Sequence, residues 1–482
     1  MSPRQRAVSG FAIIIVVMIA ALNASADTAR MTVDRVGEAG KPVFCLDGKP
    51  FYPLVYSESF SKFTSELLNQ LKQQGYNSLQ VAIDAGDARS KQLAAVLQAC
   101  QDAELPVILE LNNWRLRELL IRRPELNMVM SDGRPVEHFP DYANPATRRA
   151  HFSKIRNAAV YLRRYGNRPI VAVSVGAYDH FHLPDGEVHD DFVVPKHTEK
   201  QQTRLPYGRH VESQFLSDTI RSSEESAALP TTPADAGSNK RWECWLHFRR
   251  NLVTSWLRDT VDEVRREMKL PVGVSFDLNF AQREQFATPP YAWAEILDFV
   301  SVYCYGREPK ANYVTRLMRT VHREFGDAGV PMIGFLEFSS GLAGQTSGDV
   351  YAVACAPFVA GLMTTGPVPG RQHDDSRAAA FMQWARDTGT DELRRLTPKP
   401  AEVLLVVNRQ AIGLEQGAQI FLKLQKTSVD LLYVTEEWEG AGCEAYDRIV
   451  VGNGLRIPAP VSGTADRRFT RVDEVVPLRP QD

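Results

Sequence analysis

The chain has 482 residues, and its 56 Lys and Arg against 58 Asp and Glu give a formal net charge of −2 at pH 7. This length predicts two or three domains, or one large barrel with an appendage. A nearly neutral, slightly acidic surface gives no electrostatic reason to bind nucleic acid, which we exclude as a partner.

The first 26 residues have the pattern of a secretory signal peptide. Arg4 and Arg6 precede an apolar run over Phe11–Leu22, and Ala24-Ser-Ala26 supplies small residues for cleavage. We expect residues 1–26 to be removed and the protein to be periplasmic or secreted. Because this segment holds two arginines and no acid, its removal changes the charge from −2 to −4. The apolar run is shorter than the roughly 20 residues of a spanning helix, so we expect no membrane span after cleavage.

The six cysteines form no C-x-x-C pair, so the sequence predicts neither a zinc ribbon nor a redox motif. Cys45 and Cys304 lie in apolar runs. Export permits disulfides, but these surroundings favour buried thiols.

Short β-branched runs alternate with longer amphipathic stretches over most of the chain. The eight predicted strands are Phe51–Val55, Ser78–Ile83, Pro106–Leu111, Ile170–Val175, Pro271–Phe276, Phe299–Tyr303, Pro331–Glu337 and Phe358–Met363. The predicted helices are Phe63–Gln74, Ser90–Ala103, Ala146–Tyr165, Trp242–Met268, Ala311–Phe325 and Ser376–Thr388.

Eight such repeats predict a (β/α)₈ TIM barrel over residues 45–395. A doubly wound sheet would show similar alternation in fewer units. In the fourth strand, alternation predicts that Ala172, Ser174 and Gly176 face inward while Val171, Val173 and Val175 face the helices. By the same parity, Ile333, Phe335 and Glu337 share one face.

Three regions depart from the barrel pattern, of which the shortest is the irregular stretch Pro124–Asn144 after the third strand. Residues 183–240 form a long polar insertion, expected to be a lid, a binding loop or disorder. Residues 400–482 contain strand patterns at Val403–Val407, Val429–Val434 and Ile449–Val451, which predict a small, truncated flavodoxin-like α/β domain and a tail. Because Val450-Val-Gly-Asn-Gly454 lacks dinucleotide-fingerprint spacing, we predict no cofactor.

Glu337 closes the apolar run Pro331–Glu337. A buried strand ends on a charge at little cost only where that charge faces a cleft, so Glu337 marks the rim of a candidate site. The alternative is a surface glutamate that caps an edge strand.

Other polar and aromatic residues follow the predicted strands, where barrel enzymes place their sites. Carboxylates, amides and flat rings are the groups that a sugar site requires. The aromatic rings fit core closure equally well. The predicted substrate-binding residues are Asn112, Asn113, Trp114, Tyr178, Asp277, Tyr303 and Tyr305.

Four short motifs resemble the retaining clan-A glycoside hydrolases. They are Gly48-Lys-Pro-Phe-Tyr52, Gly75-Tyr-Asn-Ser-Leu79, Arg164-Tyr-Gly-Asn-Arg-Pro169 and Glu337 at the end of the seventh strand. The α/β segment that follows makes the family-42 β-galactosidase-like branch the most similar group. The resemblance implies a barrel enzyme that acts on an oligosaccharide or polysaccharide, with Glu337 as nucleophile or base.

The resemblance fails at the acid/base position, where the family has Asn-Glu and this chain has Ala177-Tyr178. Asp179 is the nearest substitute proton donor. Because the side chain of Asp179 is shorter than that of a glutamate, its carboxyl would lie farther from that of Glu337. The wider separation suits inversion through a water better than retention. Weaker candidates are Asp185, Glu187 and Glu58 as acids and Tyr178 as nucleophile.

Two other functions stay open. The missing glutamate fits a non-catalytic carbohydrate-binding or polysaccharide-assembly protein. His180, His182 and His189, with the nearby Asp185, Asp190 and Asp191, could serve a metal-assisted hydrolase, although such runs are more often solvated loops and we predict no metal. The sequence leaves the oligomeric state open, a homo-oligomer included.

Overall fold

The structure is a computed structural model that describes residues 31–36, 41–112, 117–129, 135–165, 169–177, 208–219, 229–230, 239–277, 290–303, 318–336, 348–365, 375–408, 427–435, 437–452, 455 and 468–471. Predictions that fall on other residues, including the signal peptide and most of the 183–240 insertion, lie outside this part of the chain.

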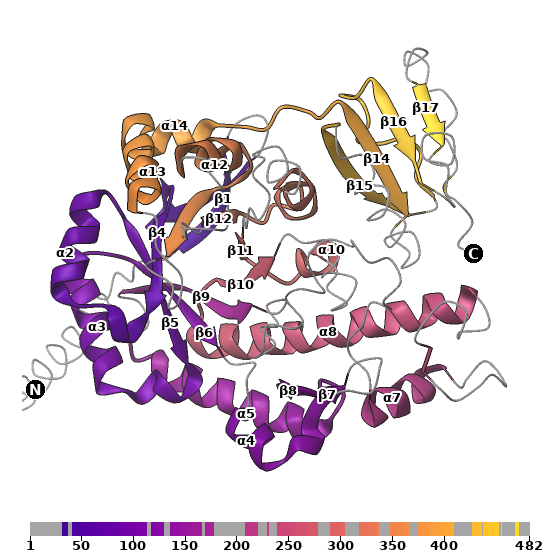
Figure 1. The fold of residues 1–482 in the computed structure, drawn as a ribbon, viewed down its shortest axis with the longest axis horizontal. Helices are drawn as coiled ribbons and strands as arrows, with labels where there is room; N and C mark the ends of the chain where they lie inside the picture. Colours follow the sequence, from indigo (N-terminus) through magenta and orange to yellow (C-terminus); the bar gives the residue numbers. More distant parts are fainter. Residues whose placement is uncertain are drawn as a thin grey trace, which may run out of the picture.

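Eight parallel strands close into a barrel (Figure 1). They follow one another around the barrel in chain order, and β13 pairs with β4 to close it. A strand lies at each of the eight predicted positions, although β4 begins at Leu54 instead of Phe51 and β13 at Gly361 instead of Phe358. The doubly wound alternative is wrong because an open sheet has no such closing pair. The strands are β4 (Leu54–Ser59), β5 (Ser78–Asp84), β6 (Val107–Asn112), β9 (Ile170–Ala177), β10 (Val272–Asp277), β11 (Phe299–Tyr303), β12 (Met332–Leu336) and β13 (Gly361–Thr365).

Helices surround the barrel, and local sequence sets their ends. Thr64 Oγ1 accepts from the backbone N–H of Leu67 where α2 begins, and Gly75 ends α2 at a φ of 102°, which favours glycine. The longer helices are α2 (Ser65–Gln74), α3 (Lys91–Asp102), α5 (Pro145–Leu162), α7 (Arg209–Thr219), α8 (Asn239–Met268), α12 (Gly348–Cys355) and α13 (Asp375–Thr388). The shorter ones are η1 (Phe60–Lys62), η2 (Ala85–Arg89), α4 (Arg117–Arg122), η3 (Pro124–Leu126), α10 (Pro290–Trp293), η4 (His322–Gly326), η5 (Ala356–Phe358) and α14 (Thr390–Arg395).

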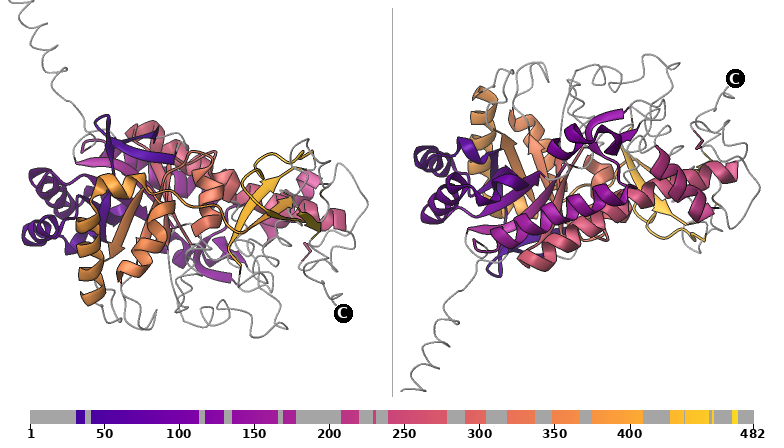
Figure 2. Two further views of the ribbon diagram at one scale, coloured as in Figure 1. Left: turned by 90° about the horizontal axis from the view of Figure 1, so that it is seen from above. Right: turned by 90° about the horizontal axis from the view of Figure 1, so that it is seen from below.

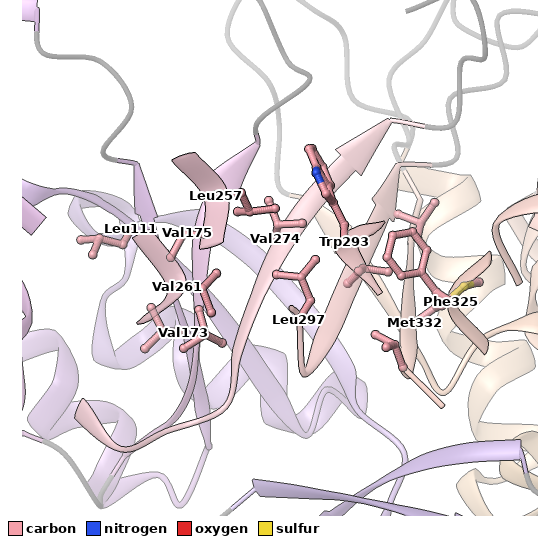
Figure 3. Close-up of a cluster of buried hydrophobic side chains, with 14 of the residues drawn as sticks. Leu111, Val173, Val175, Leu257, Val261, Val274, Trp293, Leu297, Phe325 and Met332 are labelled. Atoms are coloured by element: carbon pink, nitrogen blue, oxygen red, sulfur yellow. The ribbon is translucent and has the colours of Figure 1, made fainter. Parts of the chain in front are cut away.

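The barrel strands alternate between two apolar layers. Val173 and Val175 of β9 pack outward in the layer that holds Leu257 and Val261 of α8 (Figure 3). Ala172 belongs instead to the cluster inside the barrel, as predicted. Val171 joins that inner cluster too, so its predicted outward direction is wrong. A register shift between β6 and β9 beside Val107 and Ile108 breaks the alternation at this point.

An antiparallel sheet of three strands, β1 (Met31–Val36), β2 (Lys41–Leu46) and β3 (Lys49–Phe51), precedes the barrel. Its Met31 and Phe44 belong to the inner cluster, and the Phe44 ring packs edge-on against Phe299 with centroids 6.1 Å apart. Gly273 makes room for Phe299, because a Cβ there would lie 2.6 Å from the ring. The sheet therefore closes one end of the barrel interior. The sequence reading did not predict it.

A second small addition is the antiparallel pair β7 (Asn127–Val129) and β8 (Pro135–Pro140). It lies beside α4 and precedes α5 (Figure 1).

Four parallel strands after the barrel form a separate sheet in the order β15-β14-β16-β17. They are β14 (Val403–Asn408), β15 (Val429–Val434), β16 (Arg448–Val451) and β17 (Arg468–Arg471). The three predicted strands are confirmed, whereas the flavodoxin-like assignment stays a prediction. The long helix α8 projects past the barrel on the side where this sheet lies (Figures 1 and 2).

Arg319 joins this sheet to the barrel unit. Its Nη1 lies 3.4 Å from Asp430 Oδ1 and donates to the carbonyl of Lys399. The Asp430 carboxylate also accepts from Tyr446 Oη at 2.6 Å and from the Ala401 backbone N–H at 3.0 Å. The small sheet is thus anchored by a nearly buried ion pair.

Cys45 is a buried thiol, as predicted. Cys100, Cys355 and Cys443 are buried as well, and Cys244 is half-buried. Cys304 lies outside the described residues. None of the helices in the described ranges is long and apolar enough to cross a membrane.

Candidate active site

The inside of the barrel changes from apolar to polar along the strands. Val55, Ile108, Ala172 and Phe299 belong to the inner apolar cluster. Two residues later, on the same faces of the same strands, stand Ser57, Glu110, Ser174 and Ser301. Since every strand runs in the same direction, the polar layer lies nearer the carboxyl ends, where barrel enzymes place their chemistry.

Six buried polar side chains make up this layer. Strand register places Ser57 beside Gln80, Glu110 beside Ser174, and Ser275 beside Ser301. The layer consists of Ser57, Gln80, Glu110, Ser174, Ser275 and Ser301.

Ser57, Gln80 and Glu110 form a hydrogen-bonded group that we call the floor triad. Gln80 Nε2 donates to Ser57 Oγ at 3.2 Å and to Glu110 Oε2. Gln80 is almost completely enclosed, while Ser57 and Glu110 each keep 8% of their surface exposed. Two of the three residues therefore keep a small exposed fraction.

The three remaining serines are fully enclosed. The hydroxyls of Ser174, Ser275 and Ser301 have no hydrogen-bond partner among the residues that the structure describes. An unpaired buried hydroxyl has lost its water without a replacement, which is unfavourable in a packed core. The accessible part of the polar layer lies on the β4 and β6 side.

Burial raises the pKa of Glu110 to about 7. The cause is desolvation, and none of the eight barrel strands contributes a Lys, Arg or His that would offset it. A carboxyl with this pKa is partly protonated at neutral pH, so it can act as a hydrogen-bond donor or a proton source.

The predicted site residues fall at the carboxyl ends of these strands, beyond what the structure describes in detail. Glu337 directly follows Leu336, the last residue of β12, and Asp179 follows β9 by two residues. The backbones of Asn112, Asp277 and Tyr303 end β6, β10 and β11, while their side chains are not described. Wholly outside the described residues lie Glu337, Asp179, Asn113, Trp114, Tyr178 and Tyr305.

Two further candidates are described. Glu58 has the same parity on β4 as Leu54, which packs in the outer layer, and its Oε1 accepts from the Ser59 backbone N–H at 2.9 Å. Glu58 therefore lies on the helix-facing side, which makes it a poor proton donor for the interior. Asp84 ends β5 on the same parity as Gln80 and is exposed.

The sequence reading missed Glu110 and Gln80 because it considered only residues beyond the strand ends. The available signal was a polar residue within an apolar strand, as in Val-Ile-Leu-Glu-Leu-Asn over β6. Such a residue is expensive to bury unless it is hydrogen-bonded.

No metal-binding group of three or more His, Cys, Asp or Glu occurs among the residues that the structure covers. The histidine loop that begins at His180 lies outside them.

No protein family and no curated protein matches this sequence. Solved structures do match its fold. A β-galactosidase from the psychrophilic Marinomonas ef1 superposes with a TM-score of 0.58 at 13% identity, covering 89% of this chain and 80% of that one. A β-galactosidase from Halorubrum lacusprofundi gives 0.57 at 13% identity, covering 83% and 68%.

An α-L-fucosidase isoenzyme from Paenibacillus thiaminolyticus gives a TM-score of 0.52 at 11% identity, covering 84% of this chain and 61% of that one. At such low identities the likeness is one of fold alone. The protein therefore has a closed (β/α)₈ barrel of the kind that these glycosidases share.

Proposed function

We propose that this protein is an exported glycoside hydrolase that acts on an oligosaccharide or polysaccharide. The observation that carries the proposal is the floor triad, which places a carboxyl with a pKa of about 7 inside a glycosidase-like barrel. Glu337, which follows β12, serves as nucleophile or base, and Asp179 serves as proton donor. The likeness to β-galactosidases supports the class of substrate and leaves the particular sugar open.

The chemistry follows from two carboxyls across the scissile bond. In a retaining reaction Glu337 attacks the anomeric carbon while the donor protonates the leaving oxygen, and water then releases the sugar. Retention requires carboxyls about 5 Å apart, whereas roughly 6.5–9.5 Å leaves room for the water of an inverting reaction. Because Asp is shorter than Glu, Asp179 favours the wider spacing and inversion.

Activated aryl glycosides provide the test, since a dinitrophenolate leaving group needs little protonation. The wild-type protein should hydrolyse at least one neutral 2,4-dinitrophenyl glycoside, and Glu337→Gln should lower kcat at least 1,000-fold, a loss of about 4 kcal/mol. Glu66→Gln, an exposed glutamate of α2, is the matched control and should keep full activity. Unchanged activity in Glu337→Gln would remove Glu337 from the mechanism.

A second candidate is a carbohydrate-binding protein without catalysis. Ala177, which ends β9, stands where the glycosidase pattern has the first residue of Asn-Glu, and this substitution favours the second candidate. Sugar binding without turnover of any activated glycoside would select it. Loss of hydrolysis on chelation would point instead to a metal held by the His180 loop.

A further inference from the structure

The floor triad has unused hydrogen-bonding capacity. The amide nitrogen of Gln80 carries two hydrogens, and both are engaged, one with Ser57 and one with Glu110. The hydroxyl hydrogen of Ser57 and the Oε1 atom of Glu110 have no partner within the described part of the chain. When Glu110 is protonated, its proton belongs on Oε1, because Oε2 already accepts from Gln80. The triad then offers two neutral donors.

These donors lie where a ligand can reach them. Ser57 and Glu110 keep part of their surface exposed, in contrast to the enclosed Ser174, Ser275 and Ser301. Thr365 at the end of β13 is the register partner of Ser57, but its Oγ1 is buried. The accessible part of the floor therefore lies on β4 and β6.

The charge around the floor selects the kind of ligand. The eight strands supply no Lys, Arg or His, so none of them offers a cation to an anionic group. The inward parity of β5 adds Asp84 at the end of that strand. Acids without bases repel carboxylates and phosphates, whereas hydroxyl groups both donate and accept and suit this surface.

We propose that the floor triad is a binding subsite for the hydroxyl groups of an uncharged sugar, and that Glu110 makes the site select neutral sugars over uronic acids and sugar phosphates. The ligand class rests on the proposed function. The preference for an uncharged ring follows from the floor itself.

Calorimetry on the full chain tests the selection with pairs that differ only at C6. The probes are the methyl β-D-glycosides of galactose and glucose, each with its uronic acid counterpart. At pH 6, at least one neutral glycoside should bind, and its uronic acid should bind at least 30-fold more weakly. Equal or tighter binding of the uronic acid, or no binding of any probe, would overturn the proposal.

Two substitutions test the role of Glu110 on the neutral glycoside that binds. Glu110→Gln keeps an oxygen for Gln80 and presents an N–H in place of the acid proton, so affinity should stay within about threefold of wild type at pH 6. Glu110→Ala removes the donor and should weaken binding at least 10-fold. Circular dichroism establishes that both variants are folded, and Glu66→Gln is the control.

The pH dependence distinguishes a donor from a structural carboxyl. On the two strands that pair with β6, the described side chains of inward parity include one titratable group, Asp84 of β5, and none on β9. Wild-type affinity should fall at least 10-fold from pH 6 to pH 8.5 as Glu110 loses its proton. Glu110→Gln retains all the other groups and should show no such fall. A fall that persists in Glu110→Gln would assign the titration elsewhere and sink the proposal.

The two proposals fail separately. Neutral-sugar binding without hydrolysis of the corresponding activated glycoside would refute the hydrolase and leave the subsite standing. Hydrolysis that prefers uronides would refute the subsite and leave the hydrolase standing.

Discussion

The amide of Gln80 donates to the carboxyl of Glu110 across neighbouring strands inside the barrel, and the same nitrogen lies 3.2 Å from Ser57 Oγ. This contact ties β4, β5 and β6 together through side chains as well as through backbone. It also fixes which oxygen of Glu110 is free.

The stability of the fold should depend on pH through Glu110. Its pKa is about 7 when folded, above the value of 4.5 for a free side chain, so the folded state holds the proton more tightly. The contribution of this proton to the free energy of unfolding is therefore full below pH 4.5. It is lost as pH rises to about 7, a change of about 3 kcal/mol. Urea unfolding of wild type and Glu110→Gln at several pH values measures it. Wild type should lose about 3 kcal/mol relative to Glu110→Gln over this window, and the difference between the two should stay constant above it.

Removal of the Gln80 amide should destabilise the barrel. It should also shift to higher pH the range over which Glu110 loses its contribution to stability. Gln80→Leu leaves Glu110 without its donor, at a cost of about 1–3 kcal/mol. Without this hydrogen bond the ionised form of Glu110 is less stable relative to the protonated form, so the pKa of Glu110 should rise further. The readout is the pH midpoint of the unfolding curves, with Gln92→Leu as the control because Gln92 is exposed. An unshifted midpoint would mean that Gln80 does not stabilise the charged form.

The three-stranded sheet before the barrel should matter through Phe44. This ring is fully buried and packs against Phe299 inside the barrel. Phe44→Ala should lower the free energy of unfolding by about 3–5 kcal/mol, as expected for a large core ring. Phe51→Ala, a half-buried ring of the same sheet, should cost less. Equal losses would indicate that the sheet acts as a whole rather than through the ring inside the barrel.

Much of the barrel can be read from the sequence because each strand is a short apolar run bounded by turns. β11 and β15 match their predicted ranges residue for residue, and α3 lies between the expected Ser90 and Ala103. Closure of the sheet could not be derived in this way. It depends on the pairing of β13 with β4, far apart along the chain.

The errors have local physical causes. Val171 faces inward because a register shift interrupts the alternation of β9. The sheet before the barrel was missed because Met31–Val36 alternates only weakly and forms no part of the eight repeats. Glu110 was missed because only residues beyond the strand ends were considered, although a glutamate within the apolar run of β6 was a visible signal.

The ion pair of Arg319 and Asp430 should hold the C-terminal sheet on the barrel unit. Their side chains are only 12% and 7% exposed, so removal of one partner leaves a poorly solvated charge. Asp430→Ala also strips the acceptor from Tyr446 Oη and the Ala401 N–H, and should cost about 3–5 kcal/mol. Asp430→Asn retains an acceptor oxygen and should cost less.

Hydrogen exchange of the β14 and β16 amides measures the effect locally. Arg394→Ala, which breaks the pair with the exposed Asp391, is the control and should leave these amides unchanged. Exchange that rises equally in the barrel strands would show that the pair stabilises the whole chain instead of one docking contact.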